Sequence, residues 1–85
     1  SEMCIRDSLD INKNKNLITV ETVDSSGLLA NISKVFFDND VSIYSARINT
    51  LGEKVEDTFE IENFNKKLVP NYKIKKIISE LKKVV

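Results

Sequence analysis

A long run of strand-forming residues, interrupted by a single glycine, is the feature that most constrains how this chain folds. Residues 41–51 (VSIYSARINTL) are rich in β-branched and aromatic side chains, and residues 53–63 (EKVEDTFEIEN) alternate apolar with polar side chains. Gly52 lies between them and can adopt the positive φ of a tight turn. The pattern predicts a β-hairpin whose second strand buries one face.

A two-residue turn at Leu51 and Gly52 fixes the expected register of this hairpin. The predicted pairs are Thr50 with Glu53, Ile48 with Val55, Arg47 with Glu56 and Tyr44 with Phe59. We expect helices to cover the face that carries Ile48, Val55 and Phe59. Asp57 also lies on that face, so its carboxylate should accept backbone hydrogen bonds or lie at the edge of the sheet. The predicted pair of Arg47 with Glu56 is interpreted as structural, not catalytic.

Further elements flank the hairpin on both sides. Residues 17–23 (LITVETV) are typical of a strand, and from Leu28 to about Asp38 the apolar residues recur at helical spacing. A connector holding the only proline occupies residues 64–71, and a second helical pattern runs from there to the end of the chain. The order strand, helix, strand, strand, helix predicts an α+β, ferredoxin-like fold with two helices on one face of an antiparallel sheet.

The expected layout lacks the last strand of a ferredoxin-like sheet. Residues 8–12 (SLDIN) alternate Leu9 and Ile11 with polar residues, so an N-terminal edge strand can replace the missing one. Residues 1–8 (SEMCIRDS) follow neither a helical nor a strand period, and we interpret them as a non-native or disordered leader. The domain is therefore assigned to residues 9–85.

Composition excludes several classes of function. The 13 basic residues balance 13 acidic ones, which argues against nucleic acid or an anionic membrane as the main partner. No apolar run is long enough to cross a bilayer and no secretory signal is present, so a cytoplasmic location is expected. With one cysteine, no histidine and no glycine-rich phosphate loop, we expect no catalytic residues, no metal site and no cofactor in this chain.

The segment Asp24–Ser25–Ser26–Gly27 joins the first main strand to the first helix. Its side chains can cap the free N–H groups of the helix, which is the simpler interpretation. The same helix end can also attract a carboxylate through those N–H groups and the macrodipole. Gly27 would let a ligand approach the backbone closely.

Two segments of the chain resemble the ACT family of ligand-sensing domains. They are residues 24–29 (DSSGLL) and residues 45–59 (SARINTLGEKVEDTF), of which the second is the more specific. The resemblance is strongest to the last ACT repeat of uridylyltransferase/uridylyl-removing enzymes, and it covers about residues 9–85. Serines at positions 25 and 26 stand where that repeat usually has arginine and proline, which softens the turn.

This resemblance implies an ACT fold and a regulatory role in nitrogen metabolism. The domain would sense glutamine or a related amino acid and would signal allosterically to catalytic domains of a parent nucleotidyltransferase, which add or remove uridylyl groups on the PII protein. The ligand would lie between the glycine turn of one ACT domain and the second strand of another, in the same chain or in a dimer. The ligand-binding residues expected on this basis are Asp24, Ser25, Ser26, Gly27, Leu28, Leu29, Asn39, Asp40, Val41, Ser42 and Ile43.

Two alternatives of other kinds stay open. A structural dimerisation module is one, because Val41 and Ile43 are expected on the sheet face that no helix covers and can pack there against another sheet. The other is the ACT domain of a different amino-acid-controlled enzyme or of a transcriptional regulator, since one fold hosts many functions.

Overall fold

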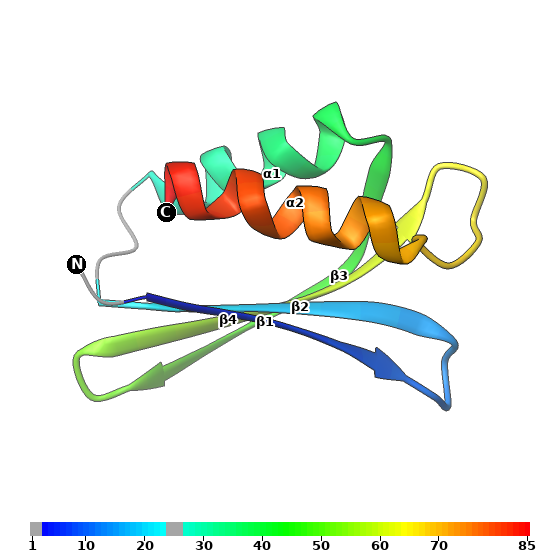
Figure 1. Ribbon diagram of the computed structural model, residues 1–85. Helices are drawn as coiled ribbons and strands as arrows, with labels where there is room; N and C mark the ends of the chain where they lie inside the picture. Colours follow the sequence, from blue (N-terminus) through cyan, green and yellow to red (C-terminus); the bar gives the residue numbers. More distant parts are fainter. Residues whose placement is uncertain (1–2, 24–26) are drawn as a thin grey trace.

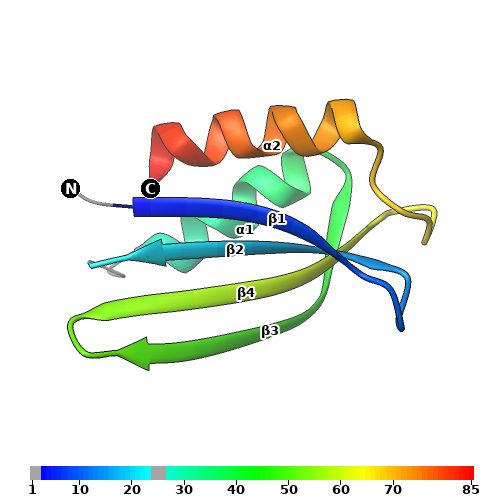
Figure 2. The same cartoon turned by 60° about the horizontal axis from the view of Figure 1, so that its bottom comes forward.

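The structure, a computed structural model, describes residues 3–23 and 27–85. Its elements are β1 (Met3–Asp10), β2 (Lys15–Thr22), α1 (Leu28–Asp38), β3 (Val41–Leu51), β4 (Lys54–Asn63) and α2 (Asn71–Val84). The strands form one antiparallel sheet in the order β1-β2-β4-β3, and both helices pack on the same face (Figures 1 and 2). The predicted α+β layout is confirmed and is consistent with a ferredoxin-like fold.

One hydrophobic core lies between the helices and the sheet. In β2 and β4 the alternation directs every second side chain towards the helices. In the helices, apolar residues at spacings of three and four face the sheet. Phe36 of α1 and Phe59 of β4 meet edge to face, with ring centroids 5.5 Å apart. The buried core consists of Ile18, Val20, Leu28, Ile32, Val35, Phe36, Val41, Phe59, Ile61, Val69, Ile74, Ile77 and Leu81.

The hairpin of β3 and β4 exists, but its predicted register is wrong. The two-residue turn is formed by Gly52, with φ of 66°, and Glu53, so that Leu51 pairs with Lys54. Every pair near the turn is shifted by two residues from the expectation. Among the consequences, Thr58 instead of Glu56 lies opposite Arg47. Ile48 shares the face of Phe59 as expected, yet it is 58% exposed because it lies near the free end of the hairpin.

A β-bulge at Tyr44 changes which residues of β3 face the helices. The pairing shifts between Ile43, which lies opposite Ile61, and Ser45, which lies opposite Glu60. The extra residue reverses the alternation, so Val41 and Ile43 lie on the helix side. Val41 is buried in the core. The expectation that these two residues occupy the uncovered sheet face is therefore wrong.

An N-terminal strand completes the sheet, as the sequence pattern allowed, but it is longer than expected. β1 begins at Met3, ends at Asp10 and pairs with β2 along its whole length. Residues 3–8, interpreted from the sequence as a leader without strand character, thus belong to the sheet; their origin as a non-native leader stays a prediction. Ile5 packs partly against the core, and Ile11 lies in the turn that follows.

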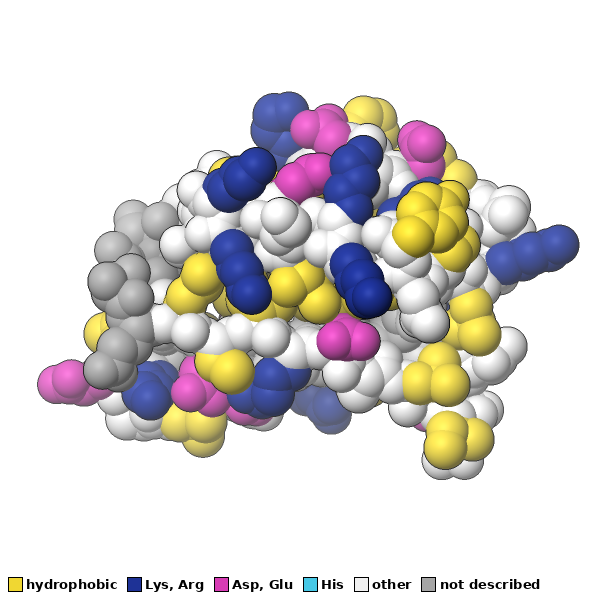
Figure 3. All heavy atoms as spheres, viewed as in Figure 1, with side chains coloured by type: hydrophobic (Ala, Val, Ile, Leu, Met, Phe, Trp, Pro, Cys, Tyr) yellow, Lys and Arg dark blue, Asp and Glu magenta, His cyan; other side chains and the backbone are white. Residues whose placement is uncertain are grey.

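The surface over the helices is rich in lysine. Figure 3 shows dark-blue side chains above yellow apolar ones on this side of the molecule, and Lys75, Lys76, Lys82 and Lys83 of α2 are exposed. These lysines form the solvated face of an amphipathic helix whose other face is buried. Neither described helix is long and apolar enough to cross a membrane.

Candidate functional site

The N-terminus of α1 is the first part of the expected binding site. Gly27 is the N-cap residue with φ of 70°, no described side chain caps the helix, and its first turn contains no acidic residue. The first helical hydrogen bond is donated by Asn31 to the Gly27 carbonyl, which leaves the N–H groups of the preceding residues to other acceptors. Leu28 is buried, whereas Leu29 is about half exposed. The predicted ligands Asp24, Ser25 and Ser26 lie outside the described residues.

The other predicted residues lie where α1 ends and β3 begins. Asn39 is buried, and its Nδ2 donates to the Val35 carbonyl at 2.8 Å and to Glu80 Oε1 at 3.0 Å, which ties α1 to α2. Asp40 takes a positive φ of 56° in the turn, and its carbonyl accepts from the Phe64 N–H. Both residues therefore have structural functions. Val41 belongs to the core.

An apolar hollow of about 480 Å³ lies beside this end of α1. It is lined by Ser33, Phe36, Phe37, Val41, Ser42, Ile43 and Phe64. Phe37 and Phe64 contact each other with ring centroids 6.1 Å apart, although Phe37 is 69% exposed. Of the predicted residues, Ser42 and Ile43 thus line this hollow, while Asp40 is exposed outside it.

One chain does not bring the two predicted groups of ligands together. Gly27 and Leu29 lie at the start of α1, and Ser42 and Ile43 lie beyond its end. The 11 residues of the helix separate them by about 16 Å, because a helix rises about 1.5 Å per residue. A site that uses both groups requires a second domain.

Asp57 is an isolated carboxylate inside the two-layer fold. It lies in the central strand β4, opposite Val20 and Ile48, and is 2% exposed. Its Oδ1 is buried and has no hydrogen-bond partner among the described residues. Burial raises the pKa of this carboxyl group. The inner-face position was predicted correctly. Of the two expectations for the carboxylate, a place at the sheet edge is wrong, and the expected backbone hydrogen bonds are not made by Oδ1 to any described residue.

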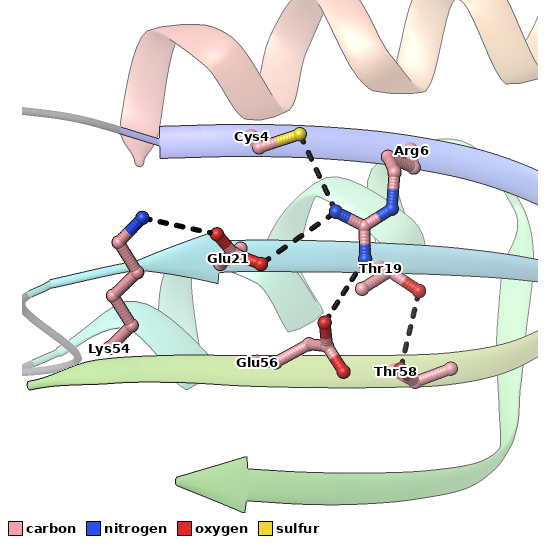
Figure 4. A network of polar contacts seen from close by, with 7 residues as sticks. All are labelled: Cys4, Arg6, Thr19, Glu21, Lys54, Glu56 and Thr58. Carbon is pink, nitrogen blue, oxygen red and sulfur yellow. Dashed lines mark hydrogen bonds and ion pairs between the residues drawn. The ribbon is translucent and has the colours of Figure 1, made fainter. Parts of the chain in front are cut away.

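The sheet face away from the helices carries a network of charged and hydroxyl side chains (Figure 4). Arg6 Nη2 donates to Glu56 Oε2 at 3.1 Å, and its Nη1 lies 3.8 Å from Glu21 Oε2. Lys54 Nζ lies 3.5 Å from the other oxygen of Glu21, and the hydroxyls of Thr19 and Thr58 are 3.2 Å apart. Three strands are therefore joined by side chains across this face.

This network was not anticipated from the sequence. The predicted pair of Arg47 with Glu56 is replaced by Arg6 with Glu56, because the shifted register moves Arg47 away. Arg6 was missed since residues 1–8 were set aside, although Cys4 and Arg6 alternate with Met3 and Ile5 as strand residues do. In residues 3–23 and 27–85, no group of three or more acidic or cysteine side chains is arranged to hold a metal ion.

These features define a small α+β domain with two helices on an antiparallel sheet and without a cluster of reactive groups among its described residues. No family model matches the chain, and no solved structure matches it. Its homologues are the bifunctional uridylyltransferase/uridylyl-removing enzymes of bacteria.

Three of these relatives illustrate the extent of the similarity. The enzyme of Psychrobacter cryohalolentis is 37% identical over 68 residues, which are 80% of this chain and 7% of the relative. That of Acinetobacter baumannii is 34% identical over 82 residues, 92% of this chain and 9% of the relative. That of Cupriavidus metallidurans is 50% identical over 46 residues, 54% of this chain and 5% of the relative. The chain thus spans less than a tenth of the relatives it matches.

Proposed function

We propose that this chain is an ACT domain that regulates a uridylyltransferase/uridylyl-removing enzyme by binding glutamine or a related amino acid. The observation that carries the proposal is the similarity to these enzymes over 80 to 92% of the chain. The two-layer fold is compatible with it. On this proposal the domain lies in the C-terminal part of a cytoplasmic parent enzyme, whose catalytic domains act on the PII protein.

The start of α1 would receive the carboxylate of the amino acid. The N–H groups of the first helical turn and the positive end of the helix dipole favour an anion at this position. Gly27 adds no side chain there, and no atom of the described residues lies within 4 Å of the position that a Cβ would take. The hollow beside Ser42 and Ile43 of a second domain would complete the site.

Regulation follows from binding between two domains. A ligand that contacts both domains binds one arrangement of the pair more tightly than others and shifts the population towards it. A differential of about 1 to 3 kcal/mol changes that population between 5- and 150-fold. The signal can therefore reach a distant catalytic domain without any contact between ligand and substrate.

A purely structural dimerisation module is the second candidate. Phe37, Phe64 and Ile43 form an exposed apolar surface beside β3, which is an edge strand with one side unpaired in this sheet. This surface supports pairing of two domains with or without a ligand. A measurement of amino-acid binding distinguishes the sensor domain from the dimerisation module.

A matched pair of glycine variants tests the proposal. Gly27 and Gly52 have similar positive φ values of 70° and 66°, and at both positions no described residue lies within 4 Å of where a Cβ would be. Gly27→Ala and Gly52→Ala should therefore lose similar stability, about 1 kcal/mol each. Only Gly27 lies at the proposed site. Calorimetric titration of the full chain with millimolar glutamine should show saturable binding that Gly27→Ala weakens and Gly52→Ala leaves unchanged.

Two results would count against the sensor. No heat and no thermal shift with glutamine or other amino acids, from a folded sample that still self-associates, favours the dimerisation module. If Gly27→Ala and Gly52→Ala weaken glutamine binding equally, the cause is the lower stability of the fold and not a lost contact with the ligand.

A further inference from the structure

The basic side chains on the open sheet face differ in whether they have a partner. Arg6, Lys13, Lys15 and Lys54 each form an ion pair with a glutamate, at 3.0 to 3.5 Å for the shortest pair of each. Arg47 projects from β3 on the same face and forms no ion pair with any described residue. Its guanidinium is the uncompensated positive group of this part of the surface.

Arg47 borders a basin of about 260 Å³ on the open face. The basin is lined by Lys13, Leu17, Ser45, Arg47, Thr58 and Glu60, which come from the β1–β2 turn and from β2, β3 and β4. Arg47 lies directly opposite Thr58, and Ser45 lies opposite Glu60. The register thus places Ser45 and Thr58, which carry hydroxyl groups, beside Arg47 on one face, with Leu17 opposite Glu60 on the next strand.

The Glu60 carboxylate does not neutralise Arg47. Its Oε1 accepts a hydrogen bond from Lys13 Nζ at 3.1 Å, and this carboxylate raises the pKa of Lys13. Its Oε2 is buried and has no hydrogen-bond partner among the described residues. With two cations and one anion in the lining, the basin keeps one positive charge in excess, although the whole chain is formally neutral.

The geometry points to a carboxylate-binding site in this basin, which we term the Arg47 basin. The guanidinium presents parallel N–H groups that match the two oxygens of a carboxylate, and the hydroxyls of Ser45 and Thr58 can donate to the same group. A volume of about 260 Å³ admits a group no larger than a small amino acid or an acidic side chain. The inference goes beyond the proposed function, since the basin lies on the opposite face of the sheet from α1.

The carboxylate can come from a free small acid or from an aspartate or glutamate of a polypeptide that covers the open face. Both present the same chemistry to Arg47. The ordinary alternative is an arginine that is simply solvated or that swings to Glu60 in solution. Lysine in place of arginine would keep the charge but lose the bidentate fork.

Nuclear magnetic resonance of the full chain tests the inference through its two arginines. Sodium acetate is titrated at constant ionic strength, with sodium chloride as the reference. The Arg47 Nε–H signal should shift in a saturable way, whereas that of Arg6, which is held by Glu56, should not. In the variants, binding is followed through the backbone amide signals of Ser45 and Thr58, because glutamine and lysine lack the Nε–H group. Arg47→Gln should weaken acetate binding at least ten-fold, Arg47→Lys less, and the matched control Lys54→Gln not at all.

Two further probes identify the source of the carboxylate. Free glutamine carries an α-carboxylate, and N-acetylglutamic acid α-amide carries a side-chain carboxylate as in a polypeptide. Tighter binding of the first assigns the Arg47 basin to a metabolite, and tighter binding of the second assigns it to a protein partner. Shifts identical in acetate and chloride, or unchanged in Arg47→Gln, overturn the inference. Glutamine shifts confined to Gly27 and α1, with neither acetate nor N-acetylglutamic acid α-amide shifting the Arg47 signal, overturn the inference and leave the proposed function intact.

Discussion

Glu56 and Asp57 are neighbours in the sequence, yet they lie on opposite faces of β4 in opposite environments. Glu56 is on the open face, where Arg6 donates to it at 3.1 Å. Asp57 is on the helix-covered face, 2% exposed, with a buried oxygen that no described residue satisfies. The difference comes from strand alternation, which sends successive side chains to opposite sides.

The comparison shows that the two faces stabilise the fold by different means. The covered face depends on apolar burial, which is strong, is not weakened by salt and tolerates a charge poorly. The open face depends on exposed ion pairs, which are weak and screened by salt. Residues on the open face can therefore serve in binding with little loss in the free energy of unfolding.

The largest expected effect is a difference in the free energy of unfolding between substitutions of two adjacent residues, one on each face of β4. Phe59→Ala removes a ring that is buried against Phe36 and should lower the free energy of unfolding by about 3–5 kcal/mol. Thr58→Ala on the open face removes one hydroxyl contact and should lower it by less than about 1 kcal/mol. Urea unfolding followed by circular dichroism measures both. Similar losses for the two variants would contradict the assignment of the core.

A smaller effect of the opposite sign is expected for Asp57→Asn. Because the pKa of Asp57 is raised above its ordinary value of 3.8, the folded chain holds this proton more tightly than the unfolded chain. The group's stabilising contribution is present below that ordinary value and is lost as pH rises through the raised folded pKa. As pH rises from 3.5 to 7, Asp57→Asn should therefore become more stable than the wild type, by a difference in the free energy of unfolding on the order of 1 kcal/mol. A difference that does not depend on pH would refute a buried, unpaired carboxylate.

The smallest effect is expected for Glu56→Gln on the open face. The variant loses the partner of Arg6, an exposed pair, so the melting temperature should fall by no more than about 2 °C in low salt. The difference should shrink further in about 1 M salt, where charges are screened within about 3 Å. A larger loss that salt does not change would mean that this network stabilises the fold as the core does.

Much of the fold was predictable because its elements have strong local patterns. The predicted bounds of α1 and β3 match the structure, since apolar periodicity and turn residues mark both ends of each. The register of the hairpin was not predictable in the same way. The bulge at Tyr44 has no local marker such as glycine, although it decides that Val41 lies beneath the helices.

The candidate site was less predictable than the fold. Single-sequence patterns placed Asp57 on the inner face, but its position in a central strand depends on strand order, which only the assembled sheet defines. The unpaired state of Arg47 likewise depends on the register and on the partners of its neighbours. Gly27 and Ile43 were grouped through resemblance to a family, and one chain holds them at opposite ends of α1.

The measurement that tests the account most directly is sedimentation equilibrium of the chain with and without glutamine. If the amino acid binds between the start of α1 in one copy and the hollow beside Ile43 in another, binding and association are linked. At a protein concentration where both monomer and dimer are present, millimolar glutamine should raise the dimer fraction, and Gly27→Ala should abolish the increase while Gly52→Ala retains it. Saturable binding of glutamine that Gly27→Ala weakens, in a chain whose association does not change, would contradict the account.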